Sequence, residues 1–215
     1  MNRTKSCLWL LLAVCTWTTH GWSQQSSALF ANGSSITTTA PPSEQQVTVY
    51  LREIATVPAS VAGLAQNGAA EIFGRIGVRI HWRQGVPPAS LKQAISVELV
   101  AYTPQTTLPG ALACTVLYDH PTIQVFYDRI QGAEAPGRVL AHVLAHEITH
   151  VLQGNAHHSD TGIMKASWSR SDFDRMRFTT LPFTEEDVGL IRSALATRSP
   201  QREPRQPPLT AAAGQ

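Results

Sequence analysis

The chain has 215 residues, 43% of them hydrophobic, and its 17 basic and 15 acidic side chains give a formal net charge of +2. This near-neutral balance provides no basic surface of the kind that binds nucleic acid, so we expect no nucleic-acid partner. The length suits one domain with one hydrophobic core, flanked by shorter segments.

The first 23 residues have the features of a secretion signal. Arg3 and Lys5 give a positive start, residues 7–17 form an apolar run, and residues 21–23 include small side chains at the cleavage position. The apolar run is too short for a permanent membrane span, and no other stretch approaches the ~20 apolar residues required. We therefore expect a secreted or periplasmic protein without stable membrane insertion.

Cleavage after Ser23 would change both the charge and the cysteine count. Removal of Arg3 and Lys5 leaves 17 − 2 = 15 basic against 15 acidic side chains, a net charge of zero. Removal of Cys7 and Cys15 would leave Cys114, which we expect to be a small buried hydrophobic residue without a disulfide.

Two further segments have the composition of unstructured chain. Residues 24–46 are rich in Ser, Thr and Gln, which predicts a flexible linker, and residues 199–215 contain four prolines, which predicts a disordered tail. The region between them, residues 47–198, is predicted to form one domain, and we expect a monomer.

Hydrophobic periodicity within this domain alternates between the two-residue period of strands and the longer period of helices. Pro58 precedes the first helix, and Thr184 with Asp187 approximates a capping box before the last one. In chain order, the pattern predicts a strand over 47–55, a helix over 59–76, strands over 78–82, 95–102, 112–118 and 123–128, and helices over 138–153 and 185–197.

The helix predicted over residues 138–153 contains the pentapeptide H-E-I-T-H, from His146 to His150. Pro136 suits its first turn and Gly154 its end. Histidines four residues apart share one helix face and can hold one zinc ion. Glu147 would lie beside the ion, where it can take a proton from a zinc-bound water, which is the chemistry of a zinc peptidase.

A catalytic zinc needs a third protein ligand, and two adjacent histidines, His157 and His158, follow in the run N-A-H-H-S-D-T-G-I-M. The segment resembles the metzincin peptidases, whose pattern is H-E-x-x-H-x-x-G-x-x-H followed by a Met-turn. It departs from that pattern because Gln153 occupies the glycine position and the glycine and third histidine come late. The run H-S-D-T-G-I-M is also similar to the H-S-x-x-x-x-x-M segment of matrix-metalloprotease-type members. The resemblance implies His158 as third ligand, with His157 as the alternative, and Met164 as the Met-turn residue.

The same resemblance implies the fold and the binding mode. We expect an α+β, metzincin-like catalytic domain, with a mixed twisted sheet of four to five strands, an active-site helix, a Met-turn and a C-terminal helix. An edge strand within residues 112–128 would pair with an extended substrate. In the Met-turn, Gly162 would allow a close approach of the backbone and Trp168 would pack nearby.

The implied activity is that of a secreted zinc endopeptidase acting on a peptide or protein substrate, with Zn²⁺ as cofactor. His146, His150 and His158 would hold the metal, and Glu147 would be the general base. A second hypothesis takes the third ligand from a carboxylate, namely Asp160, Glu185 or Glu186. A third is an exported zinc-stabilised binding domain without peptidase activity. His142, one turn before His146, is expected only to hydrogen-bond to a neighbouring loop.

Overall fold

The computed structural model describes residues 8–9, 45–91, 94–117 and 121–198. The predicted tail, all but two residues of the predicted signal peptide and all but the last two residues of the predicted linker lie outside this part of the chain; Gln45 and Gln46 belong to a strand. Within the described part, none of the helices combines the length and the apolar character needed to span a bilayer.

The strands form one mixed sheet in the order β1-β5-β6-β4-β2-β3. Neighbours from β6 to β3 are parallel, whereas β5 runs antiparallel to β6 and β1 antiparallel to β5. The strands are β1 (Leu8–Trp9), β2 (Gln45–Glu53), β3 (Val78–Gln84), β4 (Ile95–Val100), β5 (Ala113–Val116) and β6 (Thr122–Phe126). The predicted mixed sheet is confirmed, and β1 is an unpredicted addition at its edge.

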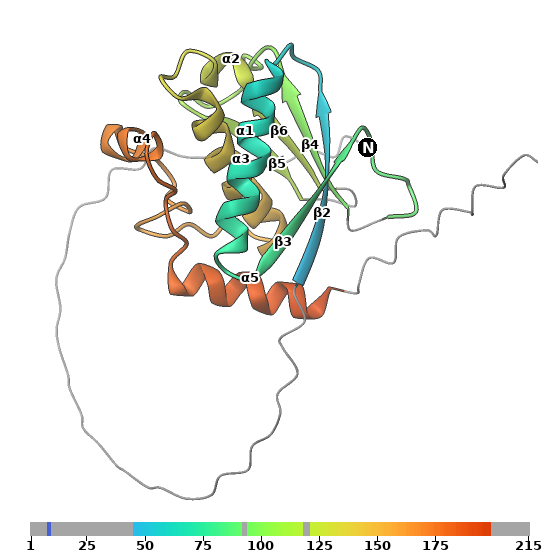
Figure 1. Ribbon diagram of the computed structural model, residues 1–215. Coiled ribbons are helices and arrows are strands. Elements are labelled where there is room, and N and C mark those ends of the chain that lie inside the picture. Colours follow the sequence, from blue (N-terminus) through green and yellow to red (C-terminus); the bar gives the residue numbers. More distant parts are fainter. Residues whose placement is uncertain (1–7, 10–44, 92–93, 118–120, 199–215) are drawn as a thin grey trace, which may run out of the picture.

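Two long helices, α1 (Ala59–Gly74) and α3 (Pro136–Gln153), pack against each other over one face of the sheet (Figure 1). The C-terminal helix α5 (Glu185–Thr197) contacts α3. Two short helices, α2 (Tyr127–Ile130) and α4 (Arg170–Met176), flank α3 in sequence. The predicted α+β class and the three predicted long helices, α1, α3 and α5, are therefore confirmed.

The sheet has its main apolar core on one of its faces. Along β2, Val47, Val49 and Leu51 are buried in the core that the helices share. On the other face an ion pair joins Arg52 to Glu98, and Gln124 donates to the Glu98 carboxylate at 3.3 Å. Because the larger apolar surface lies on one face, α3 packs against that face, where it contacts β5 and β6.

Two departures from the predicted elements have a local physical cause. The strand predicted to reach residue 128 ends at Phe126, because Asp128 is turned into α2, where its carboxylate accepts hydrogen bonds from the Thr103 backbone N–H at 3.1 Å and hydroxyl at 2.9 Å. Helix α4 was not predicted at all. It has a capping box formed by Ser169 and Asp172, which stabilises seven residues too short to show a helical period.

Cys114 is buried, as the sequence predicts. Its side chain is buried in a small apolar cluster with Ala111 and Phe126, on the sheet face opposite α3. In the full chain Cys114 is disulfide-bonded, whereas the expectation of an unbridged residue concerns the chain after cleavage and stays a prediction. The other two cysteines, Cys7 and Cys15, lie outside the described residues.

The contact between α1 and α3 leads to a stability prediction. A Cβ atom added at Gly68 of α1 would lie 2.7 Å from the Cβ of Ala141 in α3. Gly68→Ala should therefore force the helices apart and lower the free energy of unfolding by about 1–3 kcal/mol. Gly63→Ala, in the same helix with nothing within 4 Å, should instead raise it by about 0.5–1 kcal/mol. Urea denaturation of both variants tests the contact, and equal effects would contradict it.

Candidate functional site

The second half of α3 brings the H-E-I-T-H residues into the interior. The helix begins at Pro136 and ends at Gln153, and the next residue, Gly154, adopts the left-handed conformation (φ 68°) and donates its N–H to the His150 carbonyl at 2.9 Å. The predicted proline start and glycine end are thus confirmed. Because sheet and helices surround this half of α3, His146, Glu147 and His150 are all buried.

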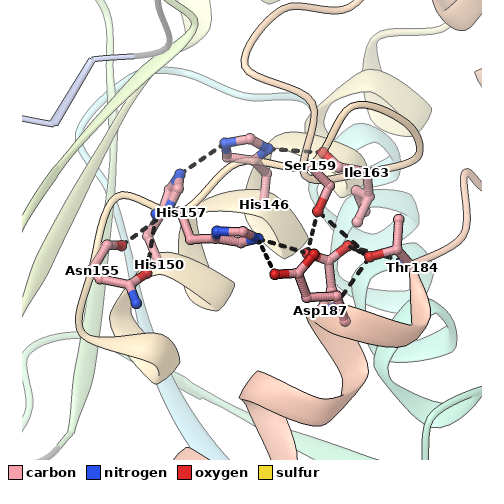
Figure 2. Close-up of polar contacts among 9 residues, drawn as sticks. His146, His150, Asn155, His157, Ser159, Ile163, Thr184 and Asp187 are labelled. Atoms are coloured by element: carbon pink, nitrogen blue, oxygen red, sulfur yellow. Dashed lines mark hydrogen bonds and ion pairs between the residues drawn. The ribbon is translucent and has the colours of Figure 1, made fainter. Parts of the chain in front are cut away.

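Hydrogen bonds fix which nitrogen of each α3 histidine carries a proton. His146 Nδ1 lies 2.8 Å from the Ile163 carbonyl, and His150 Nδ1 lies 3.1 Å from the Asn155 carbonyl (Figure 2). Since a carbonyl can only accept, both Nδ1 atoms must donate. In the neutral rings the two Nε2 atoms are then unprotonated, yet they lie 2.9 Å apart. Two facing lone pairs at this distance repel each other, and a metal ion bound beside them by both nitrogens would relieve that repulsion.

Burial keeps these rings neutral. Burial, together with the smaller effect of neighbouring imidazoles, lowers the pKa of His146 to about 3 and the pKa of His150 to about 2. Burial and the nearby His157 also lower the pKa of His158. The side chains are therefore neutral at physiological pH, which is the form in which imidazole binds a metal.

His158 completes a three-histidine group. Its ring centroid lies 5.4 Å from that of His146 and 4.9 Å from that of His150, and one ring nitrogen from each of the three lies within 4.8 Å of the others. His158 Nε2 is buried and has no hydrogen-bond partner. Three neutral imidazoles with converging, unsatisfied nitrogens fit a zinc ion that keeps an open fourth position.

His157 lies next to His158 but its ring points elsewhere. Its Nε2 lies 3.7 Å from a Glu186 carboxylate oxygen and 4.0 Å from an Asp187 carboxylate oxygen, both on α5 (Figure 2). The structure thus does not bring His157 into the three-histidine group. The carboxylates considered as alternative ligands, Asp160, Glu185 and Glu186, are exposed and do not join it either.

The loop that carries His158 is held by α5. Asp187, which is fully buried, accepts hydrogen bonds from the Ser159 hydroxyl at 2.6 Å and from the Thr184 backbone N–H at 2.9 Å (Figure 2). The second bond belongs to the predicted capping box of Thr184 and Asp187, which is confirmed. The sequence predicts Asp187 only as part of a capping box, because Ser159 lies 28 residues earlier in the chain and no pattern connects the two.

The segment around Met164 is buried and is held by a backbone hydrogen bond and by close packing. Met164 is fully buried and its carbonyl accepts a hydrogen bond from the Ser159 N–H at 2.9 Å. Gly162 has φ 75°, and a Cβ there would lie 2.3 Å from the Pro182 carbonyl oxygen. The Trp168 ring meets His146 edge-on at 5.6 Å. The predicted close approach at Gly162 and packing of Trp168 are both confirmed.

Both ring nitrogens of His142 form hydrogen bonds. Its Nδ1 lies 2.7 Å from the Arg138 carbonyl, and its Nε2 accepts from the Leu181 N–H at 3.0 Å. Leu181 belongs to the loop before α5, so the expectation that His142 hydrogen-bonds to a neighbouring loop is confirmed.

Glu147 has a partner that sequence analysis missed. The hydroxyl of Thr115, in β5, donates a hydrogen bond to Glu147 Oε2. Burial raises the pKa of Glu147 to about 7, and the bond from Thr115 opposes that rise. The available signal was a polar residue at an inward-facing position of a strand, which needs a buried partner.

These pKa values predict how the metal-free protein responds to acid. Between pH 4.5 and 6.5 the unfolded chain binds two protons, on His146 and His150, that the folded state lacks, whereas the folded state binds one, on Glu147, that the unfolded chain lacks. The net difference, 2 − 1 = 1 proton, makes the free energy of unfolding fall by about 1.4 kcal/mol per pH unit as pH decreases. The lowered pKa values of His142 and His158 act in the same direction.

Urea denaturation in the presence of a chelator, at several pH values, measures this slope. His150→Leu removes one of the titrating groups and should reduce the slope by about one proton. A stability that is flat or rises on acidification would contradict the assignment of neutral buried histidines.

The chain matches known proteins by structure and not by sequence. No family model and no curated protein matches the sequence. Among solved structures, the chain is similar to archaemetzincin from Methanopyrus kandleri, at 12% sequence identity and a TM-score of 0.42, over 72% of this chain and 98% of that one.

Proposed function

We propose that the protein is a secreted zinc-dependent endopeptidase, with His146, His150 and His158 as metal ligands and Glu147 as general base. The observation that carries the proposal is the three-histidine group itself, in which unprotonated nitrogens from α3 and the following loop converge. The next residue in α3 after His146 is a buried acid, and a purely structural zinc site has no need of one.

When bound, zinc supplies Lewis acidity, which polarises the scissile carbonyl and lowers the pKa of a water to ~7. Glu147 accepts a proton from the attacking water and passes it to the leaving amine. The pKa of its carboxyl, near 7 in the metal-free protein, suits both roles, and a nearby divalent cation lowers it toward the ionised form. His146 and His150 are held in their metal-binding tautomer by the Ile163 and Asn155 carbonyls.

The proposed substrate site is the outer edge of β5. Strand β1 pairs antiparallel with this edge, which supports its ability to accept an extended segment. Main-chain pairing of this kind tolerates many sequences and therefore suits a peptidase substrate. Because β1 lies within the predicted signal peptide, cleavage after Ser23 would remove it and leave the edge of β5 open.

Cleavage of a mixed peptide library tests the proposal. The protein should be purified from a host that exports it, and its N-terminus determined, which also tests the predicted signal cleavage. We expect the zinc-loaded protein to cut peptides, and chelation to abolish cutting. A folded, zinc-bound protein that cuts nothing would contradict the proposal and favour the zinc-stabilised binding domain.

A further inference from the structure

Thr115 is a polar residue in an apolar setting. It is 0% exposed and lies at the centre of β5, between Cys114 and Val116. Strand alternation places its side chain on the same face as Ala113, which belongs to the core shared with α3. A buried hydroxyl here is costly unless it is hydrogen-bonded, and its partner is Glu147, 32 residues away in the chain.

Thr115 donates a hydrogen bond to one of the two Glu147 carboxylate oxygens. It goes to Oε2 alone, and no hydrogen bond from a described residue to Oε1 accompanies it. The terminal torsion of a glutamate side chain is otherwise broad, so a hydrogen bond to one oxygen restricts the rotation of the carboxylate. The second oxygen remains available to take a proton.

The main chain of Thr115 lies in the strand that we propose as the substrate edge. Thr115 pairs with Ile123 of β6 on one side and with Leu8 of β1 on the other. The same residue therefore contacts the general base through its side chain and an added strand through its backbone. Any extended segment bound along β5 is thereby held at a defined position relative to the Glu147 carboxylate.

We propose that Thr115 is a positioning residue, whose hydroxyl orients the Glu147 carboxylate relative to a peptide bound along β5. This inference rests on the proposed peptidase function. Loss of the hydroxyl releases the carboxylate and lowers kcat, because proton transfer depends on its orientation. The same change leaves KM unaltered, because the β5 backbone that binds the peptide is retained.

The test compares three variants of the zinc-loaded protein. Thr115→Val keeps the shape of the side chain and removes the hydroxyl, whereas Thr115→Ser keeps the hydroxyl. Thr48→Val makes the same exchange at a half-buried position of β2 on the opposite face of the sheet. We expect Thr115→Val to lower kcat by about 10–100-fold with unchanged KM and zinc content, and Thr115→Ser to restore most of it. Thr48→Val should leave kcat unchanged.

A second measurement does not depend on activity. In the chelated protein, the effects of Thr115→Val and Glu147→Leu on the free energy of unfolding should be non-additive, because each removes the same contact. Additive effects would overturn the contact on which the inference rests.

The outcomes separate this inference from the proposed function. Wild-type kcat in Thr115→Val, beside an inactive Glu147→Gln, would overturn the role of Thr115 alone. A loss of kcat that Thr115→Ser does not restore, or that accompanies loss of zinc, would likewise assign Thr115 a structural role only. A zinc-bound wild-type protein that cleaves no peptide would overturn the proposed function and this inference together.

Discussion

Glu147→Gln is expected to lower kcat/KM for peptide cleavage by at least ~100-fold while zinc remains bound. The amide has nearly the shape of the carboxyl group, so it can fill the same buried space beside Thr115, but it cannot accept and return a proton. Zinc should be retained because the group that we propose as the ligand set consists of three histidines. Steady-state kinetics together with metal analysis of the same preparation gives both values.

Glu185→Gln provides the matched control, because it makes the same exchange at an exposed position in the first turn of α5. It should leave kcat/KM within about twofold, since surface substitutions of this kind have small effects. Normal turnover by Glu147→Gln would refute the mechanism. Loss of zinc in Glu147→Gln would instead place Glu147 among the metal ligands.

Much of the site was predictable because its signals are local. The H-E-I-T-H residues, the proline start and the glycine end all lie within one helix, and the period of its apolar residues is visible over four turns. The capping box at Thr184 is likewise contained in four residues. Where residue types within one element determine the structure, the sequence alone predicts it.

The choice between His157 and His158 was not predictable in this way. Both lie in a loop with an irregular spacing, and neighbouring side chains in a loop have no fixed relation to each other. The direction of each ring is set by distant contacts. Asp187 holds the intervening loop through Ser159, 28 residues away, and Glu186 lies beside His157.

Two further features depended on tertiary structure. The aromatic run before Asp128 predicted a longer strand, but the hydrogen bonds from Thr103, 25 residues away, hold Asp128 in a helix. In the sequence, Thr115 has the features of an ordinary strand residue, and only the packing of α3 on β5 shows that Glu147 is its partner. In contrast, the short helix α4 could have been anticipated, because Ser169 and Asp172 have the spacing of a capping box.

His158→Ala and His157→Ala are expected to differ sharply in zinc affinity. His158→Ala removes one of three ligands. It should weaken zinc binding by more than the ~10–100-fold that follows loss of a residue hydrogen-bonded to a ligand. His157→Ala should retain zinc, because its ring nitrogen lies beside the α5 carboxylates and outside the three-histidine group. Competition with a chromophoric chelator measures both affinities, and the two variants make the same change at adjacent positions of one loop.

Thermal or urea unfolding gives an independent measure of the same difference. Zinc at a thousandfold its Kd stabilises a protein by about 4 kcal/mol, provided that it binds only the folded state. That stabilisation should persist in His157→Ala and nearly vanish in His158→Ala, while the two metal-free variants unfold alike. The reverse result would make His157 the third ligand. If both histidine variants kept zinc and Glu186→Gln lost it, the third ligand would be a carboxylate, and the resemblance to the metzincin pattern would end at His150.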